Sequence, residues 1–310
     1  MSANPPITIG LPVYNREKYL RTALDSLLNQ TFGDFELVVC DNASTDDTAT
    51  IAQEFAARDK RVRFYRNDVN IGANRNFNRV FQLSRGKYLK WSTSDDYWAP
   101  ETLERLFAII ESDPSIVLCY PKTMICDHTG TPVEPYEDRL HLVEDNPADR
   151  FIGLFDRIGL CHQHLGLIRR DMLARTHLLA DHIGCDVNLL AELTLYGKFY
   201  ECPERMFFRR FHPGSSSAKK GPSRDAVEHQ LDFTDPRRVL GVRYHRWRQN
   251  AAYVSAVASA PISPSDRARL YLRIFHEAVW ERDALVEEIV SEFRANRQRR
   301  AMSAPHGSRA

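Results

Sequence analysis

The stretch that decides the fold lies between residues 87 and 98 and reads Lys87-Tyr88-Leu89-Lys90-Trp91-Ser92-Thr93-Ser94-Asp95-Asp96-Tyr97-Trp98. Its first five residues are mostly apolar and predict a short strand. Asp95 and Asp96 follow almost directly, and carboxylates are the protein ligands that Mg²⁺ and Mn²⁺ prefer. A divalent cation shared with a diphosphate-bearing substrate is one interpretation of this pair. The other is that the two residues cap a helix that begins near Pro100.

The composition indicates a folded, water-soluble protein. The chain has 310 residues, 43% of them hydrophobic, and a formal net charge of +1, so it can bury a sizeable core. No run approaches about 18 uninterrupted apolar residues, and the N-terminus lacks the pattern of a signal peptide. We therefore expect a cytoplasmic protein. The charge does not favour nucleic-acid binding, although a basic C-terminal segment at 294–300 allows a peripheral contact at the inner face of a membrane.

Six cysteines are spread along the chain without a Cys-x-x-Cys pair. This spacing signals neither a disulfide framework nor a zinc cluster, and we expect reduced, mostly buried thiols. The densest group of metal-binding residue types is Cys161-His162-Gln163-His164. It offers three potential ligands but has no distant fourth ligand at a familiar zinc spacing.

Strand-like and helix-like patterns alternate over the first 120 residues. Apolar strands are expected at 7–13, 35–40, 62–65 and 88–91, and amphipathic helices at 18–28, 46–57 and 74–83. This alternation predicts an α/β fold with a mostly parallel, Rossmann-like sheet flanked by helices. Ligands bind at the carboxyl ends of such strands. Polar residues follow each expected strand, at 12–15, 41–44, 67–72 and 94–96, so we expect these four loops to converge.

The rest of the chain is less regular. We expect helices at 100–111 and 186–195, strands at 116–120, 124–127 and 206–211, a loop-rich region at 131–149 and a mobile loop at 218–224. Ser263 and Pro264 begin a helical extension. Its apolar residues between Tyr271 and Phe293 recur at three-and-four spacing, which predicts packing on the body or on a second subunit. From residue 298 onward we expect disorder.

Four passages together resemble glycosyltransferase family 2. They are Pro12 to Asn15 with Leu27 to Thr31, Phe35 to Asp46, Asn70 to Asn76, and Gly86 to Pro100. The resemblance implies the GT-A fold and an inverting enzyme that uses sugar nucleotides. With it, we expect a glycosyltransferase domain at 1–230, made of a nucleotide-binding half (1–115) and an acceptor-side half (116–230). A helical extension at 231–297 and a tail at 298–310 would follow.

The resemblance also implies which residues bind the donor. The expected nucleotide contacts are Pro12, Tyr14, Asp41, Asn42, Arg75 and Asp95. A pyrimidine base presents an imide N–H that a side-chain oxygen at position 41 or 42 can accept, while Tyr14 packs on the ring. UDP or dTDP is therefore the expected nucleotide. Asp96 is the expected ligand of Mn²⁺ or Mg²⁺, and His212, within Arg209-Arg210-Phe211-His212-Pro213-Gly214-Ser215, is the second expected ligand.

Asp186 matches the family's general base, which takes the proton of the acceptor hydroxyl. Cys185 stands where the family usually has Glu, and Ser94 replaces an acid before the Asp pair. The competing interpretation is that Asp186 only caps its helix.

The expected activity is transfer of a single sugar to a saccharide, lipid-linked or small-molecule acceptor. The expected setting is cell-surface polysaccharide or glycoconjugate synthesis, by a protein that forms a homodimer through its C-terminal helices. The alternative is a catalytically inactive module of the same fold that binds nucleotide or carbohydrate.

Overall fold

The computed structural model describes residues 4–215 and 244–302. Within them lies one sheet whose strands are β1 (Ile7–Val13), β2 (Phe35–Asp41), β3 (Val62–Arg66), β4 (Tyr88–Trp91), β5 (Tyr97–Trp98), β6 (Ile116–Cys126), β7 (Pro132–Tyr136), β8 (Leu167–Arg169) and β9 (Lys198–Arg210). The strand order is β3-β2-β1-β4-β8-β6-β9-β5, and β7 pairs with β6. Both predicted halves of the main domain therefore share a single sheet.

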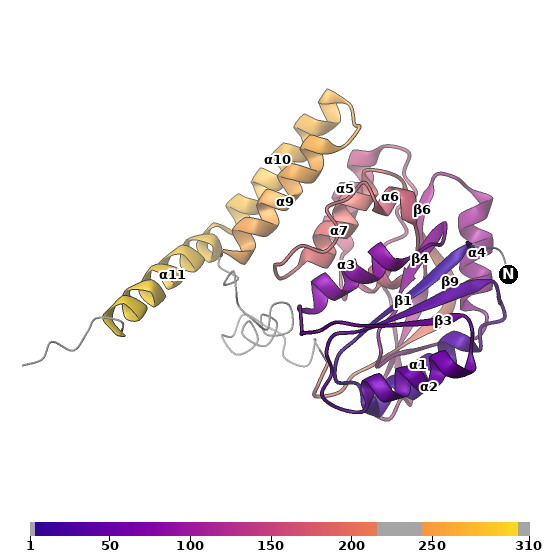
Figure 1. The fold of residues 1–310 in the computed structure, drawn as a ribbon. Coiled ribbons are helices and arrows are strands. Elements are labelled where there is room, and N and C mark those ends of the chain that lie inside the picture. The colour runs from indigo at the N-terminus through magenta and orange to yellow at the C-terminus, as the bar shows by residue number, and fades with distance from the viewer. Residues whose placement is uncertain (1–3, 216–243, 303–310) are drawn as a thin grey trace, which may run out of the picture.

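The N-terminal half of the sheet, β1 to β4, is parallel. Helices α1 (Glu17–Leu28) and α2 (Thr48–Arg58) cover one face and α3 (Ala73–Leu83) covers the other (Figure 1). β1, β2 and β4 are almost entirely buried, as expected for strands covered on both faces. The predicted α/β fold is confirmed.

The parallel register brings three predicted loops to one edge of the sheet. Val13 pairs with Asp41, which pairs with Arg66, so β1, β2 and β3 end side by side. Hydrogen bonds then join the loops: the Thr45 backbone N–H donates to Asn15 at 2.9 Å, and Asn42 Nδ2 donates to Asn70 Oδ1 at 2.7 Å. The expected convergence of these loops is confirmed.

β9 carries the C-terminal part of the domain back to the Asp pair. It runs parallel to β6 and antiparallel to β5, where Tyr97 pairs with Phe208 and Trp98 with Phe207. The facing rings stack with centroids 4.7 Å and 4.2 Å apart. This pairing places the residues after Phe208 next to Asp95 and Asp96.

Several sequence-based boundaries were wrong in this half. The strands expected at 116–120 and 124–127 form the single strand β6, and β9 begins eight residues before the expected 206. β7 lies in the region expected to be loop-rich, and almost all of its residues are exposed. The helices are α4 (Thr102–Ser112), α5 (Pro147–Arg157), the 3₁₀ helix η1 (His162–Leu165), α6 (Arg170–Leu173) and α7 (Cys185–Thr194). The helix expected at 186–195 is thus confirmed as α7.

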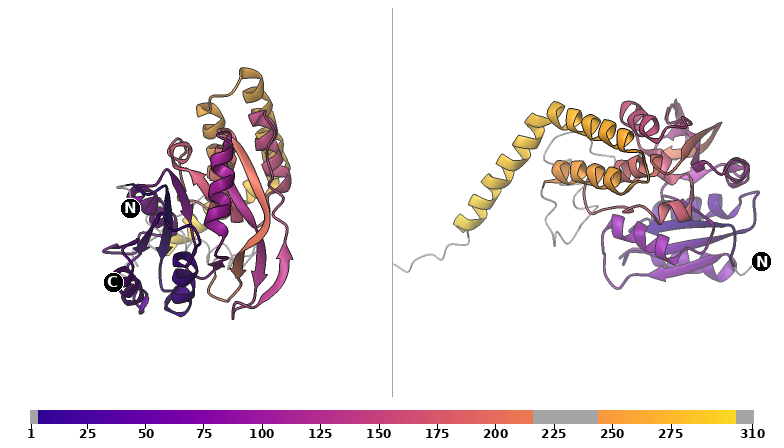
Figure 2. Two further views of the ribbon diagram at one scale, coloured as in Figure 1. Left: turned by 90° about the vertical axis from the view of Figure 1, so that its right-hand side faces the viewer. Right: turned by 90° about the horizontal axis from the view of Figure 1, so that it is seen from above.

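The C-terminal helices are α9 (His245–Ser259), α10 (Pro264–Trp280) and α11 (Arg282–Met302). α9 and α10 pair beside α5 and α7, whereas α11 extends away from the body (Figures 1 and 2). Ser263 caps α10 as predicted, because its Oγ accepts the Asp266 backbone N–H at 3.1 Å. α11 continues past residue 298, while residues 303–310 and the loop expected at 218–224 lie outside the described residues. No described helix combines the length and apolar character needed to cross a membrane.

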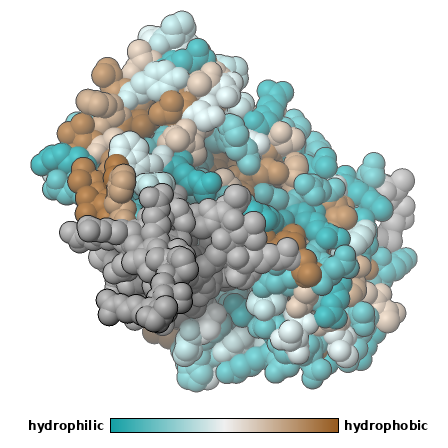
Figure 3. Space-filling view, turned by 60° about the vertical axis from the view of Figure 1, so that its left-hand side comes forward, coloured by the Kyte–Doolittle hydropathy of each residue, from teal (hydrophilic) through white to brown (hydrophobic). Residues whose placement is uncertain are grey.

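The apolar stripe of the C-terminal extension is only half buried. Leu270, Ile274 and Leu285 are buried, but other large apolar side chains face outward. The exposed ones on α10 and α11 are Leu272, Phe275, Val279, Trp280, Val286, Val290 and Phe293. Figure 3 shows apolar side chains gathered on this side of the molecule. Part of the stripe therefore packs on the body as predicted, and packing of the rest on a second subunit stays a prediction.

Candidate active site

A cavity of about 400 Å³ brings together acidic residues from distant parts of the chain. Asp95 and Asp96 reach it from the turn between β4 and β5, and Asp186 reaches it from the first turn of α7. Arg209 and Arg210, at the end of β9, line the same cavity. The three carboxylates assigned to the donor, the metal and the acceptor proton thus share one chamber.

Asp96 is buried and held from two sides. The Arg210 backbone N–H donates to its Oδ1 at 2.7 Å, and the Thr93 hydroxyl donates to its Oδ2. Burial, and next the negative charge of Asp95, raise the pKa of Asp96 above its usual value. α4 begins at Thr102 and has Glu101 at its cap position, so neither Asp95 nor Asp96 caps that helix. The interpretation of the pair as a helix cap was wrong.

Asp95 lies among cationic and hydrogen-bonding groups. His212 Nε2 donates to its Oδ2 at 2.9 Å, and the Arg16 Nε is 3.9 Å from the same oxygen. Burial would raise the pKa of Asp95, but the His212 hydrogen bond and the Arg16 charge outweigh it and lower that pKa. Asp95 is therefore the more acidic carboxylate of the pair.

His212 contacts Asp95 and not Asp96. Its Nδ1 accepts the Gly214 backbone N–H at 3.2 Å, while its ring packs on Tyr19 with centroids 4.7 Å apart. Both ring nitrogens are thus engaged, and His212 must release Asp95 before it can bind a cation. Its assignment as a metal ligand stays a prediction.

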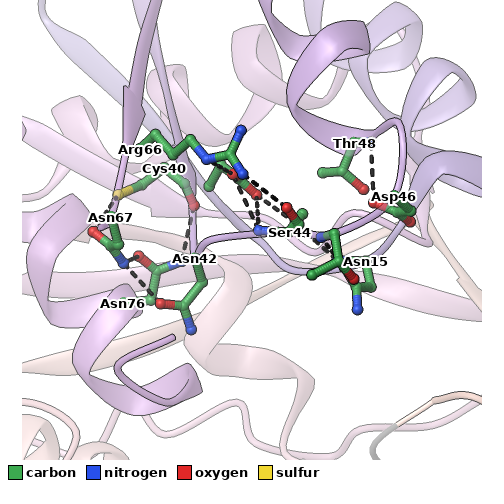
Figure 4. A network of polar contacts seen from close by, with 11 residues as sticks. Asn15, Cys40, Asn42, Ser44, Asp46, Thr48, Arg66, Asn67 and Asn76 are labelled. Carbon is green, nitrogen blue, oxygen red and sulfur yellow. Dashed lines mark hydrogen bonds and ion pairs between the residues drawn. The ribbon is translucent and has the colours of Figure 1, made fainter. Parts of the chain in front are cut away.

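Ser44 and Arg66, which belong to the polar network in Figure 4, both contact Asp41. The buried Asp41 carboxylate accepts hydrogen bonds from the backbone N–H and the hydroxyl of Ser44, and Arg66 Nε is 3.3 Å from it. Pro12 lies on β1 opposite Cys40. Tyr14, in the next loop, is 40% exposed and leaves its ring open to a ligand.

Asn42 belongs to a second, amide-rich network (Figure 4). Its Oδ1 accepts from Asn67 Nδ2 at 2.8 Å and from the Ile71 backbone N–H at 3.0 Å, and its Nδ2 donates to Asn70 Oδ1. Two donors already occupy the carbonyl that was expected to accept the base imide. In this structure Asn42 shapes the loop at 67–72.

Arg75 faces the acceptor-side half. Its guanidinium pairs with Asp181 at 2.7 Å, just before α7, and it does not line the cavity. Its neighbour Asn74 does line the cavity, and Asn74 Nδ2 lies 3.1 Å from Cys185 Sγ. Arg75 therefore joins α3 to the segment that carries Asp186, and a contact with the base stays a prediction.

Asp186 does not act as the cap of α7. The cap position is Gly184, with φ of 80°, and no side chain caps the helix. The Asp186 carboxylate accepts the Val187 backbone N–H at 3.0 Å and is also hydrogen-bonded by the buried Cys161 thiol. It lines the cavity, where it can meet a ligand.

Comparison with known proteins identifies the family. The sequence model of Glycosyl transferase family 2 matches residues 8–176, more than half of the chain. The chain belongs to glycosyltransferase family 2.

Two relatives show the extent of the similarity. This family 2 member is 36% identical over 126 residues to Escherichia coli chondroitin synthase, and the matched stretch covers 41% of this chain and 18% of that protein. It is 29% identical over 154 residues to the putative glycosyltransferase EpsH of Bacillus subtilis, and this stretch covers 49% of this chain and 43% of EpsH. The chain thus spans less than half the length of these relatives.

Solved structures of glycosyltransferases share the fold of this family 2 chain. Staphylococcus aureus TarS residues 1–349 in complex with UDP superposes with a TM-score of 0.63 at 16% identity, covering 88% of this chain and 71% of that one. A mannosyltransferase from Pyrobaculum calidifontis, in complex with GDP-Man and Mn²⁺, gives a TM-score of 0.51 at 16% identity, covering 93% and 85%. The GT-A architecture expected from the sequence is confirmed.

The structure adds cationic residues that received no role from the sequence. Arg210 is 6% exposed, lies over the Tyr19 ring at 4.6 Å and holds Asp96 through its backbone. Lys90, fully buried on β4, has its Nζ 3.2 Å from the Leu165 carbonyl oxygen and 3.0 Å from the centre of the Trp98 ring. Burial lowers the pKa of Lys90 well below its usual value. The sequence feature that could have drawn attention to Lys90 is a lysine inside an otherwise apolar strand.

His162 also lines the cavity. Its Nδ1 lies 3.0 Å from Asp138 Oδ1, so the carboxylate fixes the ring, and its Nε2 contacts Arg209. Burial lowers the pKa of His162 to about 4, so the ring is neutral near pH 7. Asp138 lies in the region expected to be loop-rich and is distant from His162 along the chain, so the sequence alone does not predict this pair.

Proposed function

We propose that this protein is a metal-dependent, inverting glycosyltransferase that moves one sugar from a nucleoside diphosphate sugar to an acceptor hydroxyl. The observation that carries the proposal is the convergence of Asp95, Asp96 and Asp186 on one cavity. Asp95 and Asp96 are placed to bind the donor and its cation, and Asp186 is placed to take the proton of the acceptor hydroxyl. Family membership supports this assignment of roles.

A divalent cation fits the donor set at the Asp pair. Burial, and next the charge of the adjacent Asp95, raise the pKa of Asp96, and a hard cation bound between the two carboxylates would offset both effects. Asp96 would hold the ion, beside Asp95 and within reach of a reoriented His212. Bound there, Mn²⁺ or Mg²⁺ supplies stabilisation of the negative charge on the departing diphosphate. The Mn²⁺ in the Pyrobaculum mannosyltransferase complex supports this choice.

The chain's own residues supply binding and proton transfer. Asp186 takes the proton of the acceptor hydroxyl as that oxygen attacks the anomeric carbon opposite the leaving group, which inverts the configuration. Arg16, near Asp95, and Arg210, beside Asp96, provide positive charge on the donor side of the cavity. Asp41 and Tyr14, with Pro12 and the loop shaped by Asn42, form the floor for the nucleotide.

The relatives support the proposed donor nucleotide and biological setting. The UDP and UDP-GlcNAc complexes of TarS support UDP, or the closely similar dTDP, as the nucleotide. The identity with chondroitin synthase supports a place in cell-surface polysaccharide or glycoconjugate synthesis. The exposed apolar face of α10 and α11 supports association of two copies of the chain.

A screen of UDP-, dTDP- and GDP-sugars with Mn²⁺ tests the proposal. The protein should release nucleoside diphosphate from one donor class, and a chelator should abolish the release. Asp186→Asn should keep donor binding and lose turnover by about 10²- to 10⁴-fold, the usual contribution of a general base. Asp171→Asn, on the exposed face of α6, is the matched control and should turn over normally. Donor binding without turnover by the wild-type protein would instead support the inactive module.

A further inference from the structure

Three residues of metal-binding type meet on the acceptor side of the cavity. The Cys161 Sγ, a ring nitrogen of His164 and a carboxylate oxygen of Asp186 all lie within 4.8 Å of one another. Cys161 directly precedes η1 and His164 lies within it, whereas Asp186 comes from α7. The sequence cluster at 161–164 lacked a distant partner, and the fold supplies it.

The ring of His164 is already oriented as a metal-ligating histidine. Its Nδ1 lies 2.5 Å from the Cys161 carbonyl oxygen. A carbonyl oxygen can only accept, so Nδ1 carries the proton and Nε2 keeps its lone pair. Metal-bound histidines characteristically donate their other ring N–H to a carbonyl or carboxylate in this way.

The three side chains also share access to the cavity. Cys161, His164 and Asp186 all belong to its lining, and Cys161 is only 6% exposed. Three protein ligands with a fourth position open to a chamber is the arrangement of catalytic, exchangeable zinc sites, whereas structural sites have four protein ligands. The open position would face the space in which the acceptor binds.

The ligand set selects a different cation from the Asp pair. A thiolate and an imidazole favour Zn²⁺, while Mg²⁺ and Mn²⁺ favour the carboxylate oxygens of Asp95 and Asp96. We propose that Cys161, His164 and Asp186 form a Zn²⁺ site, separate from the donor-cation site. On binding, the Cys161 thiol loses its proton to solvent, and zinc bonds form to Sγ, His164 Nε2 and a carboxylate oxygen of Asp186.

Occupation of this site should inhibit sugar transfer. Zn²⁺ engages the carboxylate of Asp186, which then cannot take the acceptor proton. This consequence rests on the proposed function, in which Asp186 is the base. The presence of the zinc site itself does not rest on it.

Cobalt titration of the metal-free protein tests the site. Co²⁺ bound by a thiolate gives a near-ultraviolet charge-transfer band, which carboxylate-bound Co²⁺ at Asp95 and Asp96 does not give. We expect the band to saturate at one equivalent and to vanish when Zn²⁺ is added. Cys161→Ser should remove it, and Cys202→Ser, which alters another buried cysteine on β9, should not. Absence of the band, or an equal band in Cys161→Ser, overturns the site.

A second variant covers the case in which Cys161→Ser fails to fold. His164→Gln retains an amide that can bond the Cys161 carbonyl oxygen, and thermal melting checks its fold. Loss of a direct ligand should weaken Zn²⁺ binding by at least about 100-fold, the upper range for loss of an outer-shell partner. Unchanged Zn²⁺ affinity in a folded His164→Gln protein contradicts the proposal.

Inhibition is measured separately, with Mn²⁺ and the active donor in excess. Zn²⁺ should inhibit the wild-type and Cys202→Ser proteins, and the inhibitory concentration should rise by at least about 100-fold in His164→Gln. Equal inhibition of all three proteins overturns the regulatory role. If no donor supports turnover, the proposed function fails, while the cobalt spectrum still decides the zinc site.

Discussion

The amide network around Asn42 gives a prediction whose size follows from the structure. Asn42→Ala removes three hydrogen bonds. One N–H of the Asn67 amide, which is 2% exposed, and the part-buried Ile71 backbone N–H lose their acceptor, while the other Asn67 N–H still donates to Asn76 Oδ1. A buried donor left unsatisfied costs about 1–3 kcal/mol. The part-buried Ile71 donor should contribute at the low end of this range. The two donors together should therefore lower the free energy of unfolding by about 2–4 kcal/mol, a large part of the 5–15 kcal/mol typical of a domain.

Urea denaturation measures this loss. The midpoint should fall in Asn42→Ala, while Asn29→Ala, at an exposed position after α1, should stay within about 0.5 kcal/mol of the wild type. Donor binding measured below the transition separates the two roles of Asn42. A loss under about 1 kcal/mol together with lost nucleotide affinity would show that Asn42 reads the base and does not hold the loop, and our reasoning would be refuted.

Three further predictions concern pH, metal and assembly. Burial lowers the pKa of His162 from 6.5 to about 4, so the unfolded chain binds this proton first and stability should fall as pH drops from about 6.5 towards 4. Urea denaturation should show that the free energy of unfolding falls by about 2 kcal/mol between pH 7.5 and 5. The fall should be smaller in His162→Gln, and an equal fall in that variant would contradict the assignment. UDP with Mn²⁺ at about 100 times the dissociation constant should stabilise the protein by about 2.7 kcal/mol in thermal melting, and a chelator should remove most of this gain; a gain that the chelator leaves intact would exclude the cation. Light scattering should give the mass of a dimer and Phe275→Glu that of a monomer, whereas a wild-type monomer that sediments with anionic vesicles would favour a membrane contact.

The sequence predicted the parallel half of the sheet well because its strands are apolar runs and its helices carry clear stripes. Asp95, Asp96 and Asp186, which the sequence assigned to one site, line one cavity, and their roles stay predictions. The start of β9 was missed because Lys198 to Glu204 alternates imperfectly between buried and exposed residues. β7 was missed because an exposed edge strand needs no apolar pattern.

The contacts between site residues were harder to predict than the site residues themselves. The contact of His212 with Asp95 depends on the register in which Tyr97 faces Phe208, and no local pattern specifies that register. The engagement of Asn42 depends on Asn67 and Asn70, more than twenty residues away. Such contacts arise from tertiary structure, so residue type and spacing cannot reveal them.

The antiparallel pairing of β5 with β9 has a practical consequence for dividing this chain. A fragment ended at residue 176, where the family match stops, would keep β1 to β8 and look like an intact nucleotide-binding unit. It would nevertheless lack the Arg210 amide that holds Asp96, the His212 ring that holds Asp95, and Asp186 itself. The two adjacent carboxylates would then keep the Thr93 hydroxyl and the Arg16 charge but lose the partners that β9 and the residues after it supply. Truncation at that boundary should therefore yield a protein that binds its cation poorly and cannot turn over, however well the remaining strands fold.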